Sequence, residues 1–267
     1  MNESVEKAQF AWQPLTLRGI AAFAGAPLSR LLLIQFIVAL LAAVSVVWFL
    51  HRDWFPIISD SIRQLPPRGE LRSGRLDWHG PTPTRLAEGQ YLAIVVDLDH
   101  AGEARSPAHV QVEFGRNDWK FFSLLGYLQG AYPQSWQLDL DRGELGPWWG
   151  AWSPAILAIV AGLVVLILMV TWAGLATLYF LPVWLVGFFA DRELSLRGSW
   201  RLAGAALMPG ALLMCAAVLL YGTGALDIVR LMLAAAVHLV VGWFYLLASP
   251  LRLARQPVAG AKENPFA

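Results

Sequence analysis

Four long apolar segments divide the chain into membrane-like and globular parts. They are Leu31–Leu50, Ala155–Ala190, Leu202–Tyr221 and Ile228–Ala248. About 20 apolar residues are needed for a helix to cross a bilayer, so each segment is long enough to span one. Between the first two segments, the chain has the polar and apolar mixture of a globular domain. The pattern predicts a membrane all-α bundle of four transmembrane helices, the second unusually long or kinked. It also predicts a small α+β extracytoplasmic domain inserted between helices 1 and 2.

The second apolar segment allows two topologies. Residues 154–190 carry no charge and are too many for one upright crossing. Either one long helix crosses and kinks near Gly174 or Pro182, or a tight turn at residues 171–174 makes two crossings and five spans in all. Short connections rich in arginine and lysine usually face the cytoplasm. A single crossing puts three basic groups on one side: Lys7, Arg18 and Arg30; Arg192, Arg197 and Arg201; and Arg252, Arg255 and Lys262. The charge pattern therefore favours four spans with both termini cytoplasmic, in a bacterial inner membrane.

These assignments divide the chain into consecutive segments. Residues 1–29 form a cytoplasmic segment, partly interfacial, and residues 30–50 form helix 1. The extracytoplasmic domain covers 51–152, long helix 2 covers 153–190, and a cytoplasmic loop covers 191–201. Helices 3 and 4 cover 202–222 and 228–249, and a cytoplasmic tail covers 250–267. Pro209 is expected to kink helix 3. The short turn at 222–224 requires helices 3 and 4 to be antiparallel neighbours.

Tryptophans lie at both ends of the inserted domain. Aromatic rings of this kind suit the headgroup region of a bilayer. The predicted interfacial anchors are Trp48, Trp54, Trp148, Trp149 and Trp152.

Within the inserted domain, local patterns predict one short helix and several strands. Apolar residues recur at helical spacing over residues 55–65, which predicts an amphipathic helix lying on the membrane. Segments 70–78, 91–98, 110–114 and 119–123 read as strands, with residues 115–118 as a hairpin turn. Asp141 followed by Glu144 resembles a capping box that opens a short helix. The expected result is a small mixed sheet close to the outer leaflet.

Composition narrows the possible functions. Apolar residues make up 57% of the 267 and charged residues 15%, and the net charge is +1. No basic surface suggests nucleic acid as a partner. The single cysteine, Cys215, lies in an apolar segment, which excludes a disulfide within the chain and a cysteine-ligated zinc site in the domain.

The densest polar cluster of the domain is Asp97, Asp99 and His100, with His109 and Glu113 further along. Carboxylate and imidazole groups are a possible metal set, and these three are the weak metal candidates. The alternative is that Asp and His cap the end of a strand before Gly102. No fingerprint of a hydrolase, metalloprotease, P-loop or dinucleotide site occurs. We therefore assign no catalytic or cofactor-binding residue and expect no cofactor.

His238 is the only ionisable residue near the centre of a predicted span. Such residues are costly in lipid and indicate either a function or a buried partner. A proton-coupled transporter would use one, although usually beside carboxylates or broken helices. A hydrogen bond to a neighbouring helix, for instance to Thr171 or to a carbonyl freed near Pro209, is the simpler interpretation.

The order of these features resembles a known family. The matching segments are Trp54-Phe-Pro-Ile-Ile, Ile62-Arg-Gln-Leu-Pro, Gly69-Glu-Leu with Gly74-Arg-Leu, the extended run that ends in Val96-Asp97, the long uncharged helix, Arg192-Glu-Leu-Ser-Leu-Arg, and Trp200 to Pro209. Together they are similar to an uncharacterised family of bacterial four-pass membrane proteins, distantly grouped with Yip-type membrane proteins. The likeness covers about residues 15–255. It implies the architecture and a single long second helix, and it implies no reaction.

Three functions are compatible with these features. The first is a non-enzymatic scaffold or accessory subunit in the lipid bilayer, which binds another membrane protein, a lipid or a second copy of itself. The second is a small-solute or lipid transporter module that uses Pro182, Pro209 and His238. The third is an extracytoplasmic hydrolase that uses Asp97, Asp99 and His100. The sequence favours the first.

Overall fold

A computed structural model describes residues 13–256, which form two compact units. The helical unit contains the described residues up to Val46 and from Ala161 onward, and the sheet unit is Val47–Val160. Within residues 13–256, four helical stretches are long and apolar enough to cross a membrane: Leu28–Arg63, Arg142–Phe189, Leu196–Gly222 and Ile228–Arg252. The strands β1 to β8 come between the first and second of these stretches along the chain.

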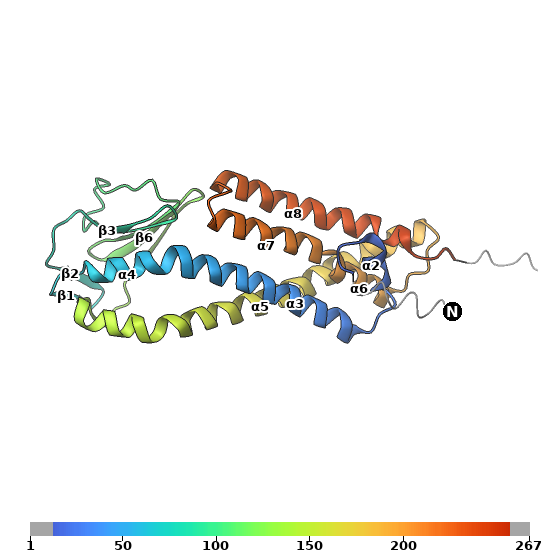
Figure 1. Cartoon of the computed structure of the whole chain (residues 1–267), viewed down its shortest axis with the longest axis horizontal. Coiled ribbons are helices and arrows are strands. Elements are labelled where there is room, and N and C mark those ends of the chain that lie inside the picture. Colours follow the sequence, from blue (N-terminus) through green and yellow to red (C-terminus); the bar gives the residue numbers. More distant parts are fainter. Residues whose placement is uncertain (1–12, 257–267) are drawn as a thin grey trace, which may run out of the picture. The chain divides into compact units, whose positions relative to one another are not determined.

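The helical unit is built from α2 (Leu17–Ala22), α3 (Leu28–Phe49), α5 (Arg142–Phe189), α6 (Leu196–Ala206), α7 (Met208–Gly222), α8 (Ile228–Ala248) and the 3-10 turn η2 (Pro250–Arg252). Helices α3 and α5 also extend into the sheet unit. Helices α7 and α8 lie side by side and antiparallel, as the short turn predicts (Figure 1). Gly224 in that turn has φ +77°, a conformation that favours glycine.

The most buried element of the helical unit is α6. Ser195 accepts a hydrogen bond from the backbone N–H of Gly198 and so caps its first turn. Its last five residues, 202–206, are buried and rich in alanine and glycine, which permits close approach by neighbouring helices. Since α6 ends at Ala206, the carbonyls of its last turn lack partners within the helix. Gln35 of α3 satisfies one of them, because its Nε2 donates to the carbonyl of Gly204 at 3.1 Å.

The third predicted span is not one continuous helix. It consists of α6 and α7, separated at Leu207, and Pro209 occupies the first turn of α7, where its missing N–H costs nothing. The predicted cytoplasmic loop at 191–201 is also too long, because α6 begins at Leu196. The Ser195 cap explains the earlier start.

The N-terminal segment packs into the bundle and does not lie only along a surface. Ile20 and Phe23, at and just beyond the end of α2, are fully buried in the same core cluster as Leu202 and Met208. Helix α2 contacts α6, α8 and η2, and Figure 1 shows it beside α6. The side chains of Ile20 and Phe23 are therefore covered by protein, and the partly interfacial position of this segment stays a prediction.

Hydrogen bonds connect distant segments at one end of the helical unit. The loop after α5 pairs with the segment after η2: Glu193 N donates to the carbonyl of Ala254 at 3.0 Å, and Gln256 N donates to that of Asp191 at 2.8 Å. The guanidinium of Arg201 binds the carbonyl of Ala26. The described arginines of the three basic groups, near residues 18–30, 192–201 and 252–255, therefore gather at the same end of this unit.

The second apolar segment forms one continuous helix, α5, over 48 residues. At 1.5 Å per residue it is about 72 Å long, more than twice the thickness of a bilayer's hydrocarbon core. It runs without a turn through residues 171–174 and through Pro182, which excludes the five-span hairpin in this structure. The helix begins at Arg142, where Asp141 Oδ1 accepts from Glu144 N at 2.9 Å. The predicted cap at Asp141 is therefore confirmed, but the helix that it begins is α5 and not a separate short helix.

The first span and the amphipathic helix that follows it are also continuous. Helix α3 passes into a π-helical turn, η1 (Leu50–Trp54), and then into α4 (Phe55–Arg63). Helical structure therefore continues beyond residue 50, where the predicted span ends. Helix α4 does not lie free either: Ile57 and Ile58 pack against the apolar cluster of the sheet unit. Ser59 of α4 accepts a hydrogen bond from Trp149 Nε1 of α5 at 2.9 Å.

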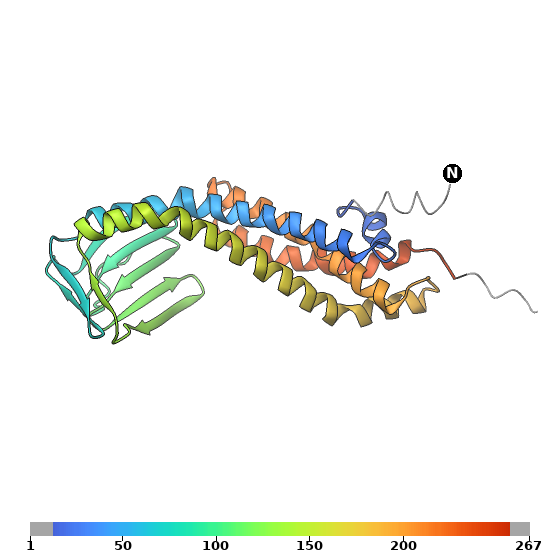
Figure 2. The same cartoon turned by 90° about the horizontal axis from the view of Figure 1, so that it is seen from below.

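The sheet unit contains two sheets. The smaller has the order β2-β1-β8, from β1 (Gly69–Arg72), β2 (Arg75–Trp78) and β8 (Gln137–Asp139). The larger has the order β3-β4-β5-β6-β7, from β3 (Thr84–Glu88), β4 (Leu92–Val96), β5 (Val110–Phe114), β6 (Asp118–Ser123) and β7 (Gly126–Ala131). Figure 2 shows these strands in green below α4 and the start of α5. Pairing is antiparallel except between β4 and β5, which are parallel. The larger sheet is therefore mixed, as predicted.

Sequence prediction of the strands was partly right. Strands β4, β5 and β6 and the turn at 115–118 fall where expected. The single segment predicted at 70–78 is instead a hairpin, because Ser73 and Gly74 adopt positive φ angles of 51° and 73°. Strands β3, β7 and β8 were not predicted.

Candidate functional site

The larger sheet has polar side chains buried on one of its faces. Side chains alternate between the two faces of a strand. Val110, Val112 and Phe114 of β5 join the apolar cluster beneath α4. Gln111 and Glu113 must therefore lie on the opposite face, yet they are only 4% and 2% exposed. The connection from β4 to β5, residues 97–109, makes the contacts that cover them. We call the polar side chains beneath this connection the buried polar network.

His100 is at the centre of the buried polar network. Its Nδ1 contacts Oε1 of Glu113, and its Nε2 lies 3.0 Å from Oδ1 of Asp118. The other oxygen of Glu113 accepts from Nε2 of Gln111 at 2.9 Å. Oε1 of Gln111 in turn accepts from the backbone N–H of Ser106, also at 2.9 Å. The network thus joins β5, β6 and the covering connection.

Backbone conformation holds His100 in this position. The residue has φ +53°, which brings its side chain back over the sheet at the end of β4. Gly115 lies directly beneath the ring, and a Cβ atom there would come within 2.2 Å of Nε2 of His100. Glycine at 115 is therefore required by close approach. Tyr132 lies alongside and donates from its hydroxyl to the carbonyl of Gly115 at 3.0 Å; burial raises the pKa of that phenol.

The surroundings of His100 favour its protonated form. Burial alone lowers the pKa of the imidazole. Hydrogen bonds to Glu113 and Asp118, together with the charge of Asp118, outweigh burial and the opposing charge of Lys120, so the pKa is raised above its ordinary value. An imidazolium with a carboxylate at each nitrogen can donate twice and has no lone pair left for a proton or a metal. In that form the ring donates to Glu113 of β5 and to Asp118 of β6, which ties the connection to both strands.

The structure separates the three weak metal candidates. Asp97 is buried, and its Oδ2 accepts from the backbone N–H of Gly102 at 3.0 Å, which is the capping role weighed as the alternative. Asp99 is exposed and lies 3.4 Å from Arg116. Only His100 belongs to the buried polar network. Among residues 13–256, no group of three or more His, Cys, Asp or Glu side chains is arranged to hold a metal ion.

Stability of the sheet unit should fall as the pH rises above neutrality. The folded pKa of His100 is raised, so the unfolded state loses this proton at lower pH than the folded state. The contribution is fully present below the unfolded pKa of about 6.5 and is lost as pH rises through the folded value. Urea unfolding of the full-length protein between pH 5.5 and 9 measures this. The variant His100→Gln should show a flatter profile; an identical slope in both proteins would contradict the assignment.

The polar and reactive residues of the predicted spans, His238 and Cys215, make contacts within the helical unit. His238 of α8 is half-buried, and its Nδ1 contacts the carbonyl of Ala235 on its own helix. Gly210 of α7 lies against the backbone of His238. Cys215 is buried. The hydrogen bond of His238 therefore stays within α8, and neither Thr171 nor a carbonyl near Pro209 is its partner.

The predicted tryptophan anchors fall into two groups. Trp148 and Trp152 are each 52% exposed, and Trp48 lies beneath the guanidinium of Arg52. Trp54 and Trp149 instead make contacts inside the sheet unit, Trp54 with the apolar cluster and Trp149 with Phe55 and Ser59. The sequence did not reveal this difference, because the partners of Trp54 and Trp149 are contributed by α4 and the sheet.

The most exposed apolar side chains of the sheet unit lie on the β6–β7 hairpin. Leu125 is 83% and Leu128 is 67% exposed, with Leu124 and Tyr127 beside them. Strand β7 is at the edge of the larger sheet. We call residues 124–131 the β7 edge. Sequence reasoning missed it because Gly126–Ala131 lacks the β-branched residues typical of strands.

Comparisons of the chain with protein-family models, with curated proteins and with solved structures gave no significant match. The fold itself defines the class: a multi-pass membrane protein with four candidate spans and a small sheet unit. Within that class, the buried polar network and the β7 edge are the two features of the sheet unit that require a functional or structural explanation.

Proposed function

We propose that the chain is a non-enzymatic scaffold or accessory subunit of a bacterial inner-membrane complex. In this proposal the sheet unit is extracytoplasmic, and the β7 edge binds an extended segment of another membrane protein. The proposal includes the resemblance to four-pass membrane proteins distantly grouped with Yip-type proteins. That resemblance concerns architecture only. The observation that carries the proposal is the unprotected state of the β7 edge.

Backbone groups along β7 are available for strand addition. The N–H of Tyr132 donates to the carbonyl of Asn117, so Tyr132 is paired inward. Pairing alternates along an antiparallel strand. Gly130 and Leu128 therefore also face β6, while the N–H and C=O groups of Tyr127, Gln129 and Ala131 point away from the sheet. An extended peptide could bind these groups as a sixth strand.

The two edges of the larger sheet differ in protection. Edge strands usually carry charged residues, proline or a bulge, which prevent pairing with other chains. Strand β3 follows this rule, with Arg85, Glu88, a bulge between Arg85 and Ala87, and Pro83 just before it. Strand β7 reads Gly-Tyr-Leu-Gln-Gly-Ala and has none of these. An apolar, uncharged edge is a hazard unless a partner covers it, which supports a docking role.

The orientation rests on charge. The three arginine groups lie at one end of the helical unit, and the positive-inside rule assigns such an end to the cytoplasm. With four crossings, the segment between the first and second spans is then outside. This supports an extracytoplasmic partner for the β7 edge.

Photo-crosslinking from the β7 edge tests the proposed function. A photoreactive amino acid in place of Leu125 should give a discrete protein adduct in intact cells. The same amino acid in place of Leu138, which is 44% exposed on β8 of the smaller sheet, is the matched control and should not. The added variant Ala131→Pro removes one outward N–H and no hydrogen bond to β6, so it should abolish the adduct while the protein stays folded.

Four outcomes contradict the proposal or change it. Equal adducts from both positions would show that the β7 edge has no special role. Adducts with lipid alone would replace the protein partner by the bilayer. An adduct of twice the chain's mass would identify a second copy as the partner. An adduct that survives Ala131→Pro would exclude strand addition as the mode of binding.

A further inference from the structure

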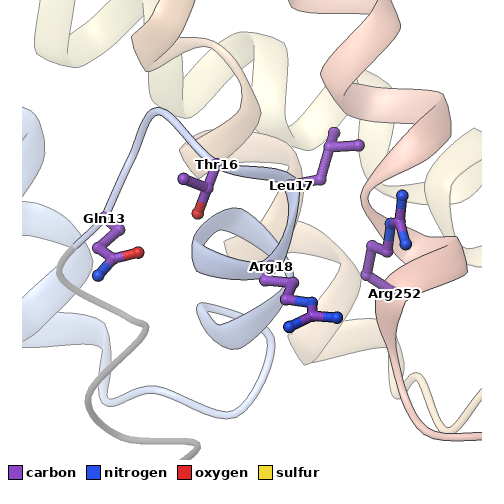
Figure 3. Close-up of a pocket in the computed structure, with 5 residues that line it drawn as sticks. All are labelled: Gln13, Thr16, Leu17, Arg18 and Arg252. Atoms are coloured by element: carbon purple, nitrogen blue, oxygen red, sulfur yellow. The ribbon is translucent and has the colours of Figure 1, made fainter.

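A pocket of about 420 Å³ lies at the arginine-rich end of the helical unit. Its lining comes from α2, the residues just before it, and η2: Gln13, Thr16, Leu17, Arg18 and Arg252. Figure 3 shows Arg18 extending from α2 on the side of η2, which carries Arg252. Two arginines from segments more than 230 residues apart therefore contribute to the lining of one pocket.

The lining offers hydrogen-bond donors and no carboxylate. Each guanidinium carries five N–H donors, and the Gln13 amide supplies two more. The Thr16 hydroxyl accepts from the N–H of Gly19 at 3.0 Å, so its own proton is available to an acceptor in the pocket. A pocket with this lining is suited to an anion.

The two pocket arginines differ from others at the same end. Arg192 donates to the carbonyl of Leu253 at 2.7 Å, and Arg201 binds the carbonyl of Ala26. These two hold the fold together. Within residues 13–256, the guanidiniums of Arg18 and Arg252 have no carboxylate or carbonyl partner. As far as the described residues are concerned, a ligand would displace no carboxylate or carbonyl from either guanidinium.

The surroundings indicate the chemical class of that anion. The described residues at this end carry seven arginines (Arg18, Arg30, Arg192, Arg197, Arg201, Arg252 and Arg255) against two carboxylates, Asp191 and Glu193. Leu15 and Leu251, next to the lining residues in the chain, are 59% and 46% exposed. Basic pockets with apolar neighbours on the cytoplasmic side of membrane proteins are suited to anionic headgroups. Guanidinium forks match phosphate oxygens in geometry.

We propose that the pocket between α2 and η2 binds a phosphate group, with Arg18 and Arg252 as its two cationic ligands. The group can belong to the headgroup of an anionic phospholipid or to a free phosphate compound. The proposal is independent of the partner proposed for the β7 edge, because it involves only the helical unit.

Binding of phosphatidylglycerol to the purified full-length protein, measured by native mass spectrometry, tests the site. The variant pair Arg18→Gln and Arg252→Gln should weaken binding by about tenfold or more, as expected for the loss of charge-assisted hydrogen bonds. The control pair Arg197→Gln and Arg255→Gln removes the same charge from exposed positions outside the pocket and should change binding less than about twofold. The pair Arg18→Lys and Arg252→Lys keeps the charge without the fork and should bind with intermediate affinity.

The outcomes are distinct. If the pocket pair and the control pair lost phosphatidylglycerol binding equally, only net charge would matter and the proposed site would be excluded. No loss in the pocket pair would overturn it as well. Inorganic phosphate and phosphatidylcholine separate the sources: competition by inorganic phosphate assigns the site to a free phosphate compound. If neither inorganic phosphate nor phosphatidylcholine displaces phosphatidylglycerol, the site is assigned to an anionic lipid.

Discussion

Replacing Glu113 with alanine should destabilise the sheet unit by about 3 kcal/mol. The side chain is 2% exposed and accepts hydrogen bonds from both His100 and Gln111. Its removal leaves the partly buried His100 ring with one carboxylate partner in place of two, and leaves the Gln111 amide without its Glu113 acceptor. Breaking a buried charge pair by removing one partner typically costs about 3–5 kcal/mol. The lower end applies here, because Asp118 still contacts His100.

Urea-dependent pulse proteolysis of the full-length protein in detergent measures this loss. Glu103→Ala is the matched control, because Glu103 is an exposed carboxylate in the same connection between β4 and β5. Its effect should stay within about 0.5 kcal/mol. Glu113→Gln, which keeps the shape and one acceptor, should fall between the two. If Glu113→Ala were no more destabilising than Glu103→Ala, the buried polar network would not be what fixes this connection to the sheet.

The second large effect is expected at the contact between α7 and α8. A Cβ atom at Gly210 would come within 2.7 Å of the carbonyl oxygen of His238, which is backbone and cannot move aside cheaply. Gly210→Leu must therefore push the two helices apart. Overpacking of this kind costs about 1–3 kcal/mol and occasionally more, and leucine should reach the upper end.

Cys215 gives a direct measurement, because it is the only cysteine and is buried on α7. Its reaction with a thiol-specific fluorophore during heating reports the opening of α7. Gly210→Leu should lower the temperature at which Cys215 reacts. Gly174→Leu on α5, where an added Cβ would meet nothing within 4 Å, should leave that temperature unchanged. Equal shifts in the two variants would contradict a specific close contact at Gly210.

The membrane architecture could be predicted because its causes are local. Length and apolar content alone identify the four stretches that can span a bilayer. The break near Pro209 follows from the missing N–H of proline. The burial of Ile20 and Phe23 could not be predicted, because the surface that receives them comes from α6, α8 and η2, far along the chain. From sequence alone, such a segment reads as interfacial.

The buried polar network was only partly accessible to prediction. His100 was identified, but it was grouped with Asp97 and Asp99 because they are adjacent in sequence. Its actual partners, Glu113 and Asp118, are brought to it by the parallel pairing of β4 with β5 and the antiparallel pairing of β5 with β6. The alternation Val-Gln-Val-Glu-Phe in β5 indicates that Gln111 and Glu113 share a face. It does not indicate that a connection covers that face.

The proposed topology puts the sheet unit outside and the arginine-rich end of the helical unit in the cytoplasm. Labelling of single cysteines by a membrane-impermeant maleimide in intact cells tests this directly, in a Cys215→Ser background. Glu103→Cys, on the exposed connection of the sheet unit, should be labelled from outside. Arg197→Cys, at the arginine-rich end, should be labelled only after the membrane is permeabilised. Labelling of Arg197→Cys in intact cells, or protection of Glu103→Cys there, would contradict the four-span topology and the docking role proposed for the β7 edge.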